Sequence, residues 1–208
     1  MPVFVKDDVR VLFVHVPKTG GSAIEDAFAD AGWDTHLLDR TSARHPSRRF
    51  RRCSAQHLHA DLLAQLVRLE RVDLVLTVVR EPLARFRSEF LWRHREDAPP
   101  AAEEVTRWGR RVLEKYAEDP FVRDNHIRPQ SQFVLPGAGL HRYEDGLQPV
   151  LDTVAERLGV TAPTLRPRAV EEGRRSADVP VGDDLRRLLV DFYADDFATL
   201  GYPTPGEA

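Results

Sequence analysis

The stretch that most constrains the fold is residues 9–28, where an apolar run gives way abruptly to a glycine-rich turn. Val9–Val16 has only Arg10 and His15 as polar residues, and so apolar and β-branched a run predicts a strand buried on both faces. Beyond the turn, apolar residues recur at helical spacing as far as Phe28. The stretch therefore predicts a strand, a turn and a helix in succession.

The turn carries the residue types of an anion site, namely Lys18, Thr19, Gly20, Gly21 and Ser22. Two glycines let the backbone bend with its N–H groups pointing inward, and Ser22 suits the N-cap position. The helix N-terminus and the charge of Lys18 both favour a phosphate or sulfate. The order differs from the nucleotide-binding loop GxxxxGK[ST], where Lys follows the glycines. The alternative interpretation is a plain strand–helix connection with a solvated lysine.

Composition excludes several classes of protein. The 208 residues suit one domain over 1–208, and 30% of them are charged with a net charge of −3, which lacks the basic excess typical of nucleic-acid binders. No apolar run approaches the ~20 residues of a membrane helix, so we expect no membrane span. Cys53 is the only cysteine, which excludes an internal disulfide and is compatible with our expectation of a cytoplasmic protein.

Two histidines lie near the start of a predicted amphipathic helix, Ser54–Leu69, for which Ser54 is the candidate N-cap. Residues two apart do not share a helix face, so His57 and His59 cannot do the same work if both are helical. Either is a candidate base, although a structural or surface role is the commoner one for a lone histidine. No other ligand residue lies at metal-binding spacing here, so we predict no metal site.

A second fully apolar strand, Val72–Val79, is followed at once by Arg80. Open α/β sheets place ligand groups at the carboxyl ends of such strands, which favours ligand contact for Arg80. Pro82 fits the first turn of the next helix, predicted from Leu83 to about His94. Ser88 lies about two helical turns beyond Arg80 and is a weaker candidate.

The rest of the chain predicts shorter elements and one basic loop. The loop, residues 39–52, contains six arginines and is either a solvated surface or a local positive field that steers an acidic substrate. These arginines are Arg40, Arg44, Arg48, Arg49, Arg51 and Arg52. The remaining elements are a strand at Trp33–Leu38, a helix at Glu103–Glu118, an irregular polar stretch at Asn125–Leu135, a strand end at His141–Glu144, a helix at Gly146–Leu158, a loop at Thr161–Ala177 and a last helix at Asp183–Leu200.

Four segments in order resemble the sulfotransferases that use 3′-phosphoadenosine 5′-phosphosulfate (PAPS). They are HVPKTGGSAI at residues 15–24, HADLLAQL at 59–66, VVREPLARFRSEF at 78–90 and DFYADDFATLGY at 191–202. The similarity is strongest to the branch that contains Golgi heparan sulfate 2-O- and 6-O-sulfotransferases and their bacterial relatives. The resemblance implies a P-loop-like three-layer α/β/α fold with a central, mostly parallel sheet.

The resemblance also implies roles for the site residues. Lys18 would stabilise charge on the bridging and sulfuryl oxygens, while backbone N–H groups of Thr19 through Ser22 would hold the 5′-phosphate. Arg80 and Ser88 would bind the 3′-phosphate. His59 would take the proton from the acceptor hydroxyl, and His57 is the second candidate because the related 2-O-sulfotransferases carry a His-x-His pair. The products would be the sulfated acceptor and 3′,5′-ADP, with no metal required.

The resemblance implies a hydroxyl acceptor, which we expect to be a glycan or glycolipid. Golgi members have a membrane anchor and a stem that this chain lacks, which favours a soluble, bacterial-type enzyme and puts heparan sulfate itself in doubt. Arg128 and Gln130 are expected to face donor or acceptor without a fixed role, and Arg174 and Arg175 lie where the family often has a basic loop. Two further hypotheses are a P-loop-type kinase and a non-catalytic module that binds anionic polymers through the arginine loop.

Overall fold

The computed structural model describes residues 1–41, 46, 50–94, 99–166 and 175–206. At its centre lies a sheet with the strand order β3-β1-β2-β4-β5. β1 runs antiparallel to both of its neighbours, whereas β4 is parallel to β2 and to β5, so only β1 opposes the common direction. The strands are β1 Val3–Lys6, β2 Val9–Val14, β3 Asp34–His36, β4 Leu74–Val79 and β5 Gly139–Arg142. The predicted mostly parallel central sheet is confirmed.

The register of the sheet brings three strand ends to one edge. Val14, the last residue of β2, pairs with Thr77 of β4, and Val79, the last residue of β4, pairs with Arg142 at the end of β5. The segments that follow these strands therefore start side by side. Open α/β sheets bind their ligands at such an edge.

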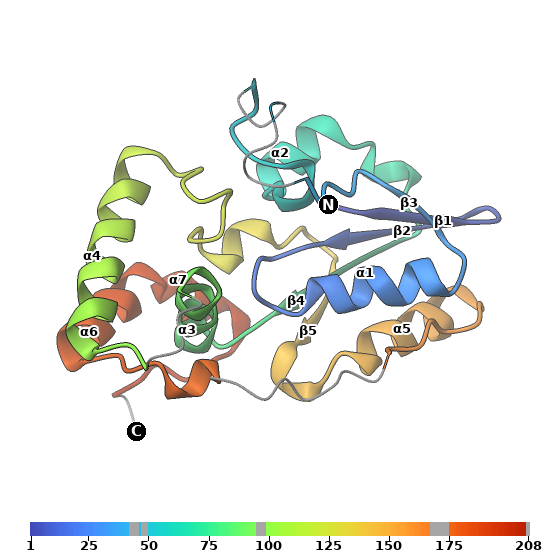
Figure 1. The fold of residues 1–208 in the computed structure, drawn as a ribbon. Helices are drawn as coiled ribbons and strands as arrows, with labels where there is room; N and C mark the ends of the chain where they lie inside the picture. Colours follow the sequence, from blue (N-terminus) through green and yellow to red (C-terminus); the bar gives the residue numbers. More distant parts are fainter. Residues whose placement is uncertain (42–45, 47–49, 95–98, 167–174, 207–208) are drawn as a thin grey trace.

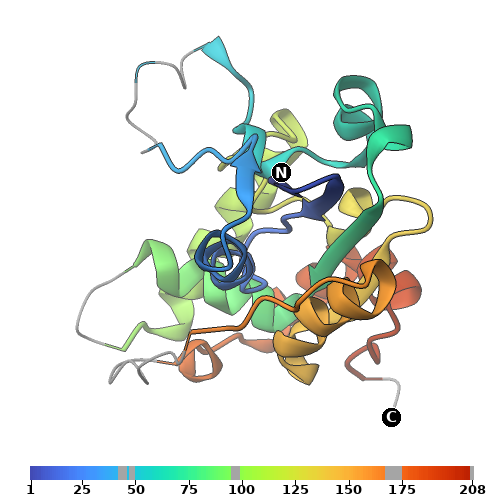
Figure 2. The ribbon, with the colours of Figure 1, turned by 90° about the vertical axis from the view of Figure 1, so that its right-hand side faces the viewer.

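Helices cover both faces of the sheet, as the three-layer prediction requires. α1 (Gly21–Asp30) and α5 (Gln148–Leu158) pack on one face, while α2 (Ala60–Leu66) and the 3₁₀ turn η4 (Gln130–Phe133) pack on the other. In both views the sheet lies between α2 and α5 (Figures 1 and 2). Alternate residues of β2 divide between the two cores, with Phe13 facing α1 and α5 and Leu12 facing α2.

A block of helices lies beyond the carboxyl ends of the strands (Figure 1). It has its own apolar core, to which α3 contributes Phe86 and Phe90, and α6 contributes Leu185 and Leu189. Its helices are α3 Pro82–Arg93, α4 Ala102–Glu118, α6 Asp183–Phe192 and α7 Ala194–Leu200. The edge of the sheet where β2 and β4 end therefore faces this block. None of the described helices is both long and apolar enough to cross a bilayer.

Two predicted helices are interrupted. The helix predicted at Ser54–Leu69 divides into a 3₁₀ turn, η2 (Ala55–His57), and α2, because Leu58 and His59 adopt extended backbone angles. The helix predicted at Asp183–Leu200 bends at Tyr193, whose buried ring and hydroxyl bond to the Ile127 carbonyl (3.0 Å) hold the chain against the core.

Strand boundaries also differ from the predictions. β1 was not predicted, although it forms a hairpin with β2 around the positive φ of Asp7. β2 ends two residues before Val16, and the segment predicted as a strand end at His141–Glu144 is the last part of β5 followed by a 3₁₀ turn, η5 (Tyr143–Asp145). Two further 3₁₀ turns are η3 (Leu69–Arg71) and η6 (Ser176–Asp178).

Candidate functional site

The turn between β2 and α1 is built around two residues with positive φ, Lys18 (71°) and Gly20 (85°). The Thr19 hydroxyl donates to the Val16 carbonyl (2.8 Å) and fixes the turn from within. The predicted N-cap role of Ser22 is wrong: Gly20 caps α1, and Ser22 lies inside the first turn. A left-handed N-cap favours glycine, and the turn still delivers the chain to the amide-rich end of α1.

Both glycines of the turn are enclosed by neighbouring side chains. A Cβ on Gly20 would lie 2.8 Å from Leu147 Cδ1, and one on Gly21 would lie 2.6 Å from His15 Nε2. His15 itself is buried, with 5% of its surface exposed. The His15 ring therefore occupies the space that any side chain at position 21 would need, which explains the glycine there better than flexibility does.

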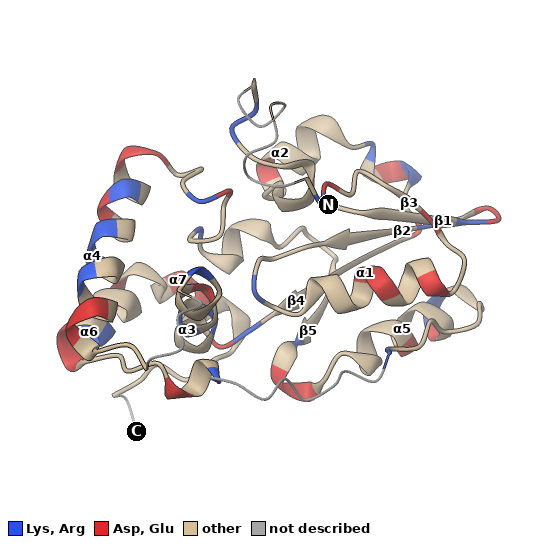
Figure 3. Cartoon of the chain, viewed as in Figure 1, with Lys and Arg blue, Asp and Glu red and all other residues tan. Residues whose placement is uncertain are grey.

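Arg80 lies directly beside the turn. Its Nη1 is 3.4 Å from the Lys18 carbonyl oxygen, and its guanidinium stacks over the Tyr143 ring at 4.5 Å. Gln130 accepts from the Arg80 N–H (2.9 Å) and donates to the Arg80 carbonyl (2.7 Å), which fixes the backbone where β4 ends. Figure 3 shows positive charge on both the turn after β2 and the end of β4. The structure thus brings Lys18 and Arg80 together from 62 residues apart.

Both Arg80 and α3, the helix that carries Ser88, contact η6. Ser88 is half-buried on α3, which packs against η6, and Ser176 of η6 accepts from Arg80 Nη2 (3.1 Å). Arg175 is exposed and pairs with Asp178 (3.3 Å). Arg174 lies outside the described residues. The structure therefore places η6, with the basic residue next to it, within reach of the Arg80 side chain.

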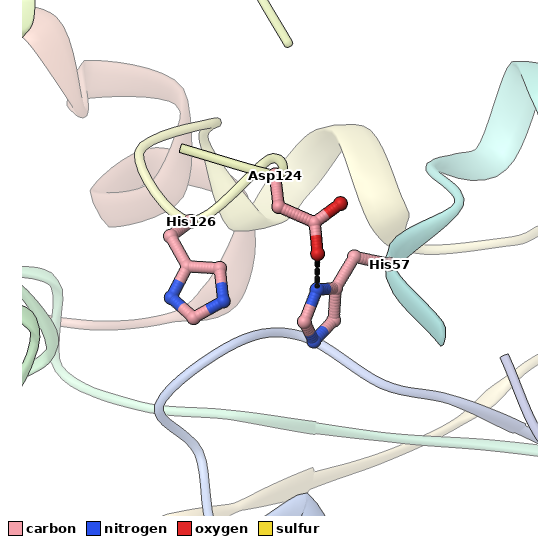
Figure 4. A group of neighbouring side chains, drawn as sticks. All are labelled: His57, Asp124 and His126. Carbon is pink, nitrogen blue, oxygen red and sulfur yellow. Dashed lines mark hydrogen bonds and ion pairs between the residues drawn. The ribbon is translucent and has the colours of Figure 1, made fainter. Parts of the chain in front are cut away.

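The two candidate histidines occupy different environments. His57 forms a hydrogen bond through Nδ1 to Asp124 Oδ2 (2.9 Å), which Figure 4 shows. His59 is the N-cap residue of α2, packs edge-on against Phe121 (5.6 Å between ring centres), and its buried Nδ1 has no hydrogen-bond partner among the described residues. The asymmetry leaves the His57 ring oriented by a carboxylate and the His59 ring held by packing.

Burial keeps both imidazoles neutral. It lowers the pKa of His57 to about 3, although the hydrogen bond that the ring donates to Asp124 acts in the opposite direction. Burial also lowers the pKa of His59, and the positive charge of Arg128 adds to the effect. The neutral imidazole is the form that accepts a proton, so each ring is in the state a general base requires.

A row of aromatic rings connects the turn to His57. The ring centres of His15 and His57 are 5.2 Å apart, those of His57 and His126 are 4.8 Å apart, and those of His126 and Trp92 are 5.3 Å apart. Lys18 Nζ lies 4.9 Å from the centre of the Trp92 ring. We call His15, His57, His126 and Trp92 the ring row; it borders the turn at both of its ends.

Glu25 of α1 joins the turn to the segment that carries the two histidines. Its carboxylate bonds to His15 Nδ1 (2.5 Å) and accepts from Gln56 Nε2 (2.8 Å) and Arg40 (3.3 Å). Burial alone would raise the pKa of Glu25, but these contacts, led by that with His15, hold the pKa below its ordinary value. One buried, ionised carboxylate therefore fixes the position of η2 relative to the turn.

A run of left-handed residues supports His57 from the other side. Arg123, Asp124 and Asn125 have φ values of 58°, 60° and 64°. Asp124 accepts from the Ser54 N–H (2.5 Å), and Asn125 Nδ2 donates to the His57 carbonyl (2.8 Å). Left-handed backbone costs about 1–2 kcal/mol per residue, so these bonds must offset considerable strain.

Several residues of this site were not predicted. Glu25, Gln56, Asp124 and His126 meet only through tertiary packing, and the only sequence signal was the density of polar residues from Asn125 onward. Gln130 supports the backbone, as described above. Arg128 likewise donates to Asn125 Oδ1 (3.1 Å) and Gln132 Oε1 (2.6 Å), so neither predicted contact with a donor or acceptor is needed to explain these two side chains.

The described arginines of the basic loop are paired with carboxylates. The pairs are Arg40 with Asp26 (2.7 Å), Arg51 with Asp39 (2.8 Å) and Arg52 with Asp119 (3.1 Å). Arg44, Arg48 and Arg49 lie outside the described residues. The described part of this loop is therefore better explained as a surface tied to its neighbours than as a positive field.

Comparison with known proteins identifies the family of the chain. A family model described as "Sulfotransferase family" matches residues 1–203, which is nearly the whole chain. No curated protein and no solved structure matches the chain.

Proposed function

Because the chain belongs to the sulfotransferase family, we propose that it moves a sulfuryl group from PAPS to a hydroxyl on a glycan or glycolipid. The observation that carries the donor assignment is the 3.4 Å approach of the Arg80 guanidinium to the Lys18 carbonyl. A nucleotide with phosphates at both its 5′ and 3′ positions needs two cationic sites near one another. Lys18 and Arg80 supply them at the edge where open α/β sheets bind ligands.

In this proposal the 5′-phosphosulfate lies on the turn and the 3′-phosphate lies against Arg80 and Ser88. The amides of Thr19 through Ser22, at the positive end of α1, hold the 5′-phosphate. Gln130 fixes the backbone of Arg80, so the guanidinium is presented from a rigid strand end. The 3′-phosphate is the group that distinguishes PAPS from ATP or ADP.

The transfer itself is an in-line displacement at sulfur. The acceptor oxygen forms a bond to sulfur while the bond from sulfur to the bridging phosphate oxygen breaks, and the hydroxyl proton passes to a neutral histidine. Lys18 stabilises the charge that develops on the bridging oxygen. We assign the base to His59, as the resemblance implies, and keep His57 as the second candidate because Asp124 already orients its ring.

The donor assignment is tested by calorimetry of the full chain with 3′,5′-ADP and with ADP. We expect 3′,5′-ADP to bind more tightly, and we expect Arg80→Gln to remove most of that difference. Arg187→Gln is the matched control, since Arg187 is an exposed arginine paired with Asp184 on α6, outside the site. Equal affinity of the wild-type protein for the two nucleotides contradicts the assignment of the 3′-phosphate site.

The acceptor is tested by incubation with labelled PAPS and a mixed panel of glycans and glycolipids, in which we expect label on a saccharide hydroxyl. Magnesium-dependent consumption of ATP would instead support the kinase hypothesis. Heparin binding that is lost when Arg48, Arg49, Arg51 and Arg52 are all changed to Ala, with no transfer to any acceptor, would support the module that binds anionic polymers.

A further inference from the structure

Three side chains of the site converge in a way that neither the donor assignment nor the assignment of His59 as the base uses. His57, Asp124 and His126 each offer a ligand atom, and these atoms all lie within 4.8 Å of one another. His57 belongs to η2, whereas Asp124 lies within the left-handed run, 67 residues further along the chain, and His126 follows that run directly. Two imidazoles and one carboxylate form a donor set that suits zinc and other transition metals better than magnesium.

The His126 ring has the orientation that a ligand needs. Its Nδ1 bonds to Glu89 Oε2 (2.7 Å), a buried carboxylate that also accepts from Arg93. The other ring nitrogen, Nε2, is directed toward the His57–Asp124 pair (Figure 4). Histidine ligands of metals commonly bond through their second nitrogen to a carboxylate, which fixes the tautomer and the direction of the lone pair.

Asp124 is held in the same manner. One of its carboxylate oxygens accepts from the Ser54 N–H (2.5 Å), and the other faces His57 Nδ1 (2.9 Å). Asp124 has a left-handed backbone, and its carboxylate points into the cluster (Figure 4). All three candidate ligands are thus restrained by contacts outside the cluster, as Glu89 restrains His126 and the Asn125 bond to the backbone restrains His57.

We propose that His57, Asp124 and His126 bind a single divalent ion of the zinc class, with water as a fourth ligand. A tetrahedral site with bonds of 2.0–2.1 Å spaces its ligand atoms about 3.3 Å apart. The separations here extend from 2.9 Å to at most 4.8 Å, so binding draws the widest pair together by about 1.5 Å. The ion engages His57 and leaves His59 outside its ligand set, so the site is separate from the assigned base.

The test is calorimetry of the metal-free full chain with Zn²⁺, and with Mg²⁺ for contrast. We expect one Zn²⁺ per chain and far weaker binding of Mg²⁺. His126→Gln and Asp124→Asn should each weaken Zn²⁺ binding by at least tenfold, and Glu89→Gln, which removes only the carboxylate behind His126, by about 10–100-fold. His36→Gln is the control, because His36 lies exposed on β3. The affinity of this variant for Zn²⁺ should equal that of the wild-type protein.

A second measurement on the wild-type protein keeps the proposal testable if a variant fails to fold. Nitrogen-15 spectra of the histidine rings, recorded during Zn²⁺ addition, should shift two imidazoles, those of His57 and His126. Absence of one-to-one binding, or shifts confined to other histidines, overturns the metal site. Neither experiment contains PAPS or an acceptor, so failure here leaves the sulfotransferase proposal untouched, and failure of nucleotide binding leaves this one untouched.

Discussion

The turn after β2 and the ring row lie side by side, but they are assembled in different ways. The turn is one contiguous stretch, in which Val16, Thr19 and Gly20 bond to near neighbours in the chain. The ring row takes His15, His57, Trp92 and His126 from four separate segments. Chemistry held in a continuous strand–turn–helix unit depends on local geometry, whereas chemistry shared among distant segments depends on the packing of the whole molecule.

The largest effect should come from removing the assigned base, His59, which lies two residues after His57 of the ring row. His59→Ala should lower kcat by about 10²–10⁴-fold, because a positioned base contributes that much to proton transfer. Affinity for 3′,5′-ADP should not change, since the donor is bound by the turn and Arg80. Rates of transfer and calorimetry on the same preparation measure both; near-normal turnover would move the base to His57.

The matching change in the turn after β2 is Lys18→Ala. It should lower kcat by about 10²–10³-fold, which is the loss typical when one group that stabilises developing charge is removed. Affinity for 3′,5′-ADP should fall as well, because Lys18 is one of the two cationic groups assigned to the phosphates of the nucleotide. An unchanged kcat with much weaker product binding would mean that Lys18 serves only to hold the nucleotide.

Glu25→Gln tests the connection between the turn after β2 and the ring row. Loss of the charge weakens the buried bonds to His15 and Gln56, and we expect the free energy of unfolding to fall by about 3 kcal/mol. Both kcat and 3′,5′-ADP affinity should fall with it. Urea unfolding measures the stability, with Glu104→Gln as the control because Glu104 is exposed. A variant that loses only kcat or only 3′,5′-ADP affinity would show that the turn and the ring row are independent.

Acidification should lower the free energy of unfolding of the protein through His57 of the ring row. The folded protein holds this histidine neutral with a pKa of about 3, whereas the unfolded chain takes up the proton near pH 6.5. Between these values the unfolded state binds more protons, so stability falls as the pH falls. From pH 7 to pH 5 the loss attributable to His57 is about 2 kcal/mol. His57→Gln should remove that part of the slope in urea unfolding at each pH; an unchanged slope would contradict it.

The smallest effect concerns Tyr143, on which the Arg80 guanidinium stacks. Tyr143→Leu keeps an apolar side chain there but removes the aromatic face, and a partly exposed cation–π contact is worth about 0.5–1 kcal/mol. We expect 3′,5′-ADP to bind about 2–5-fold more weakly, by calorimetry. Tyr116→Leu on α4 is the control, and an equal loss in both variants would point to general destabilisation.

The same contrast explains what the sequence could predict. Local apolar runs and the spacing of residues predict the turn, the parallel strands and the position of Arg80 at a strand end. The central sheet and the approach of Lys18 to Arg80 follow from these local predictions. Ser22 was misassigned because Gly20, in a left-handed conformation, is the N-cap of α1 and no side chain caps the helix. Asp124 and Glu25 escaped prediction because their partners lie far away in sequence, and no periodic pattern encodes such a meeting.

The buried carboxylate of Glu25 has a consequence for protein engineering. Glu25 bonds to His15, which precedes the glycines, and to Gln56 on η2. Replacing residues 15–22 alone with those of a relative would therefore change the residue at position 15 without the matching changes at positions 25 and 56. Chimeras that exchange residues 15–25 together with 54–59 should therefore retain activity where shorter grafts lose it.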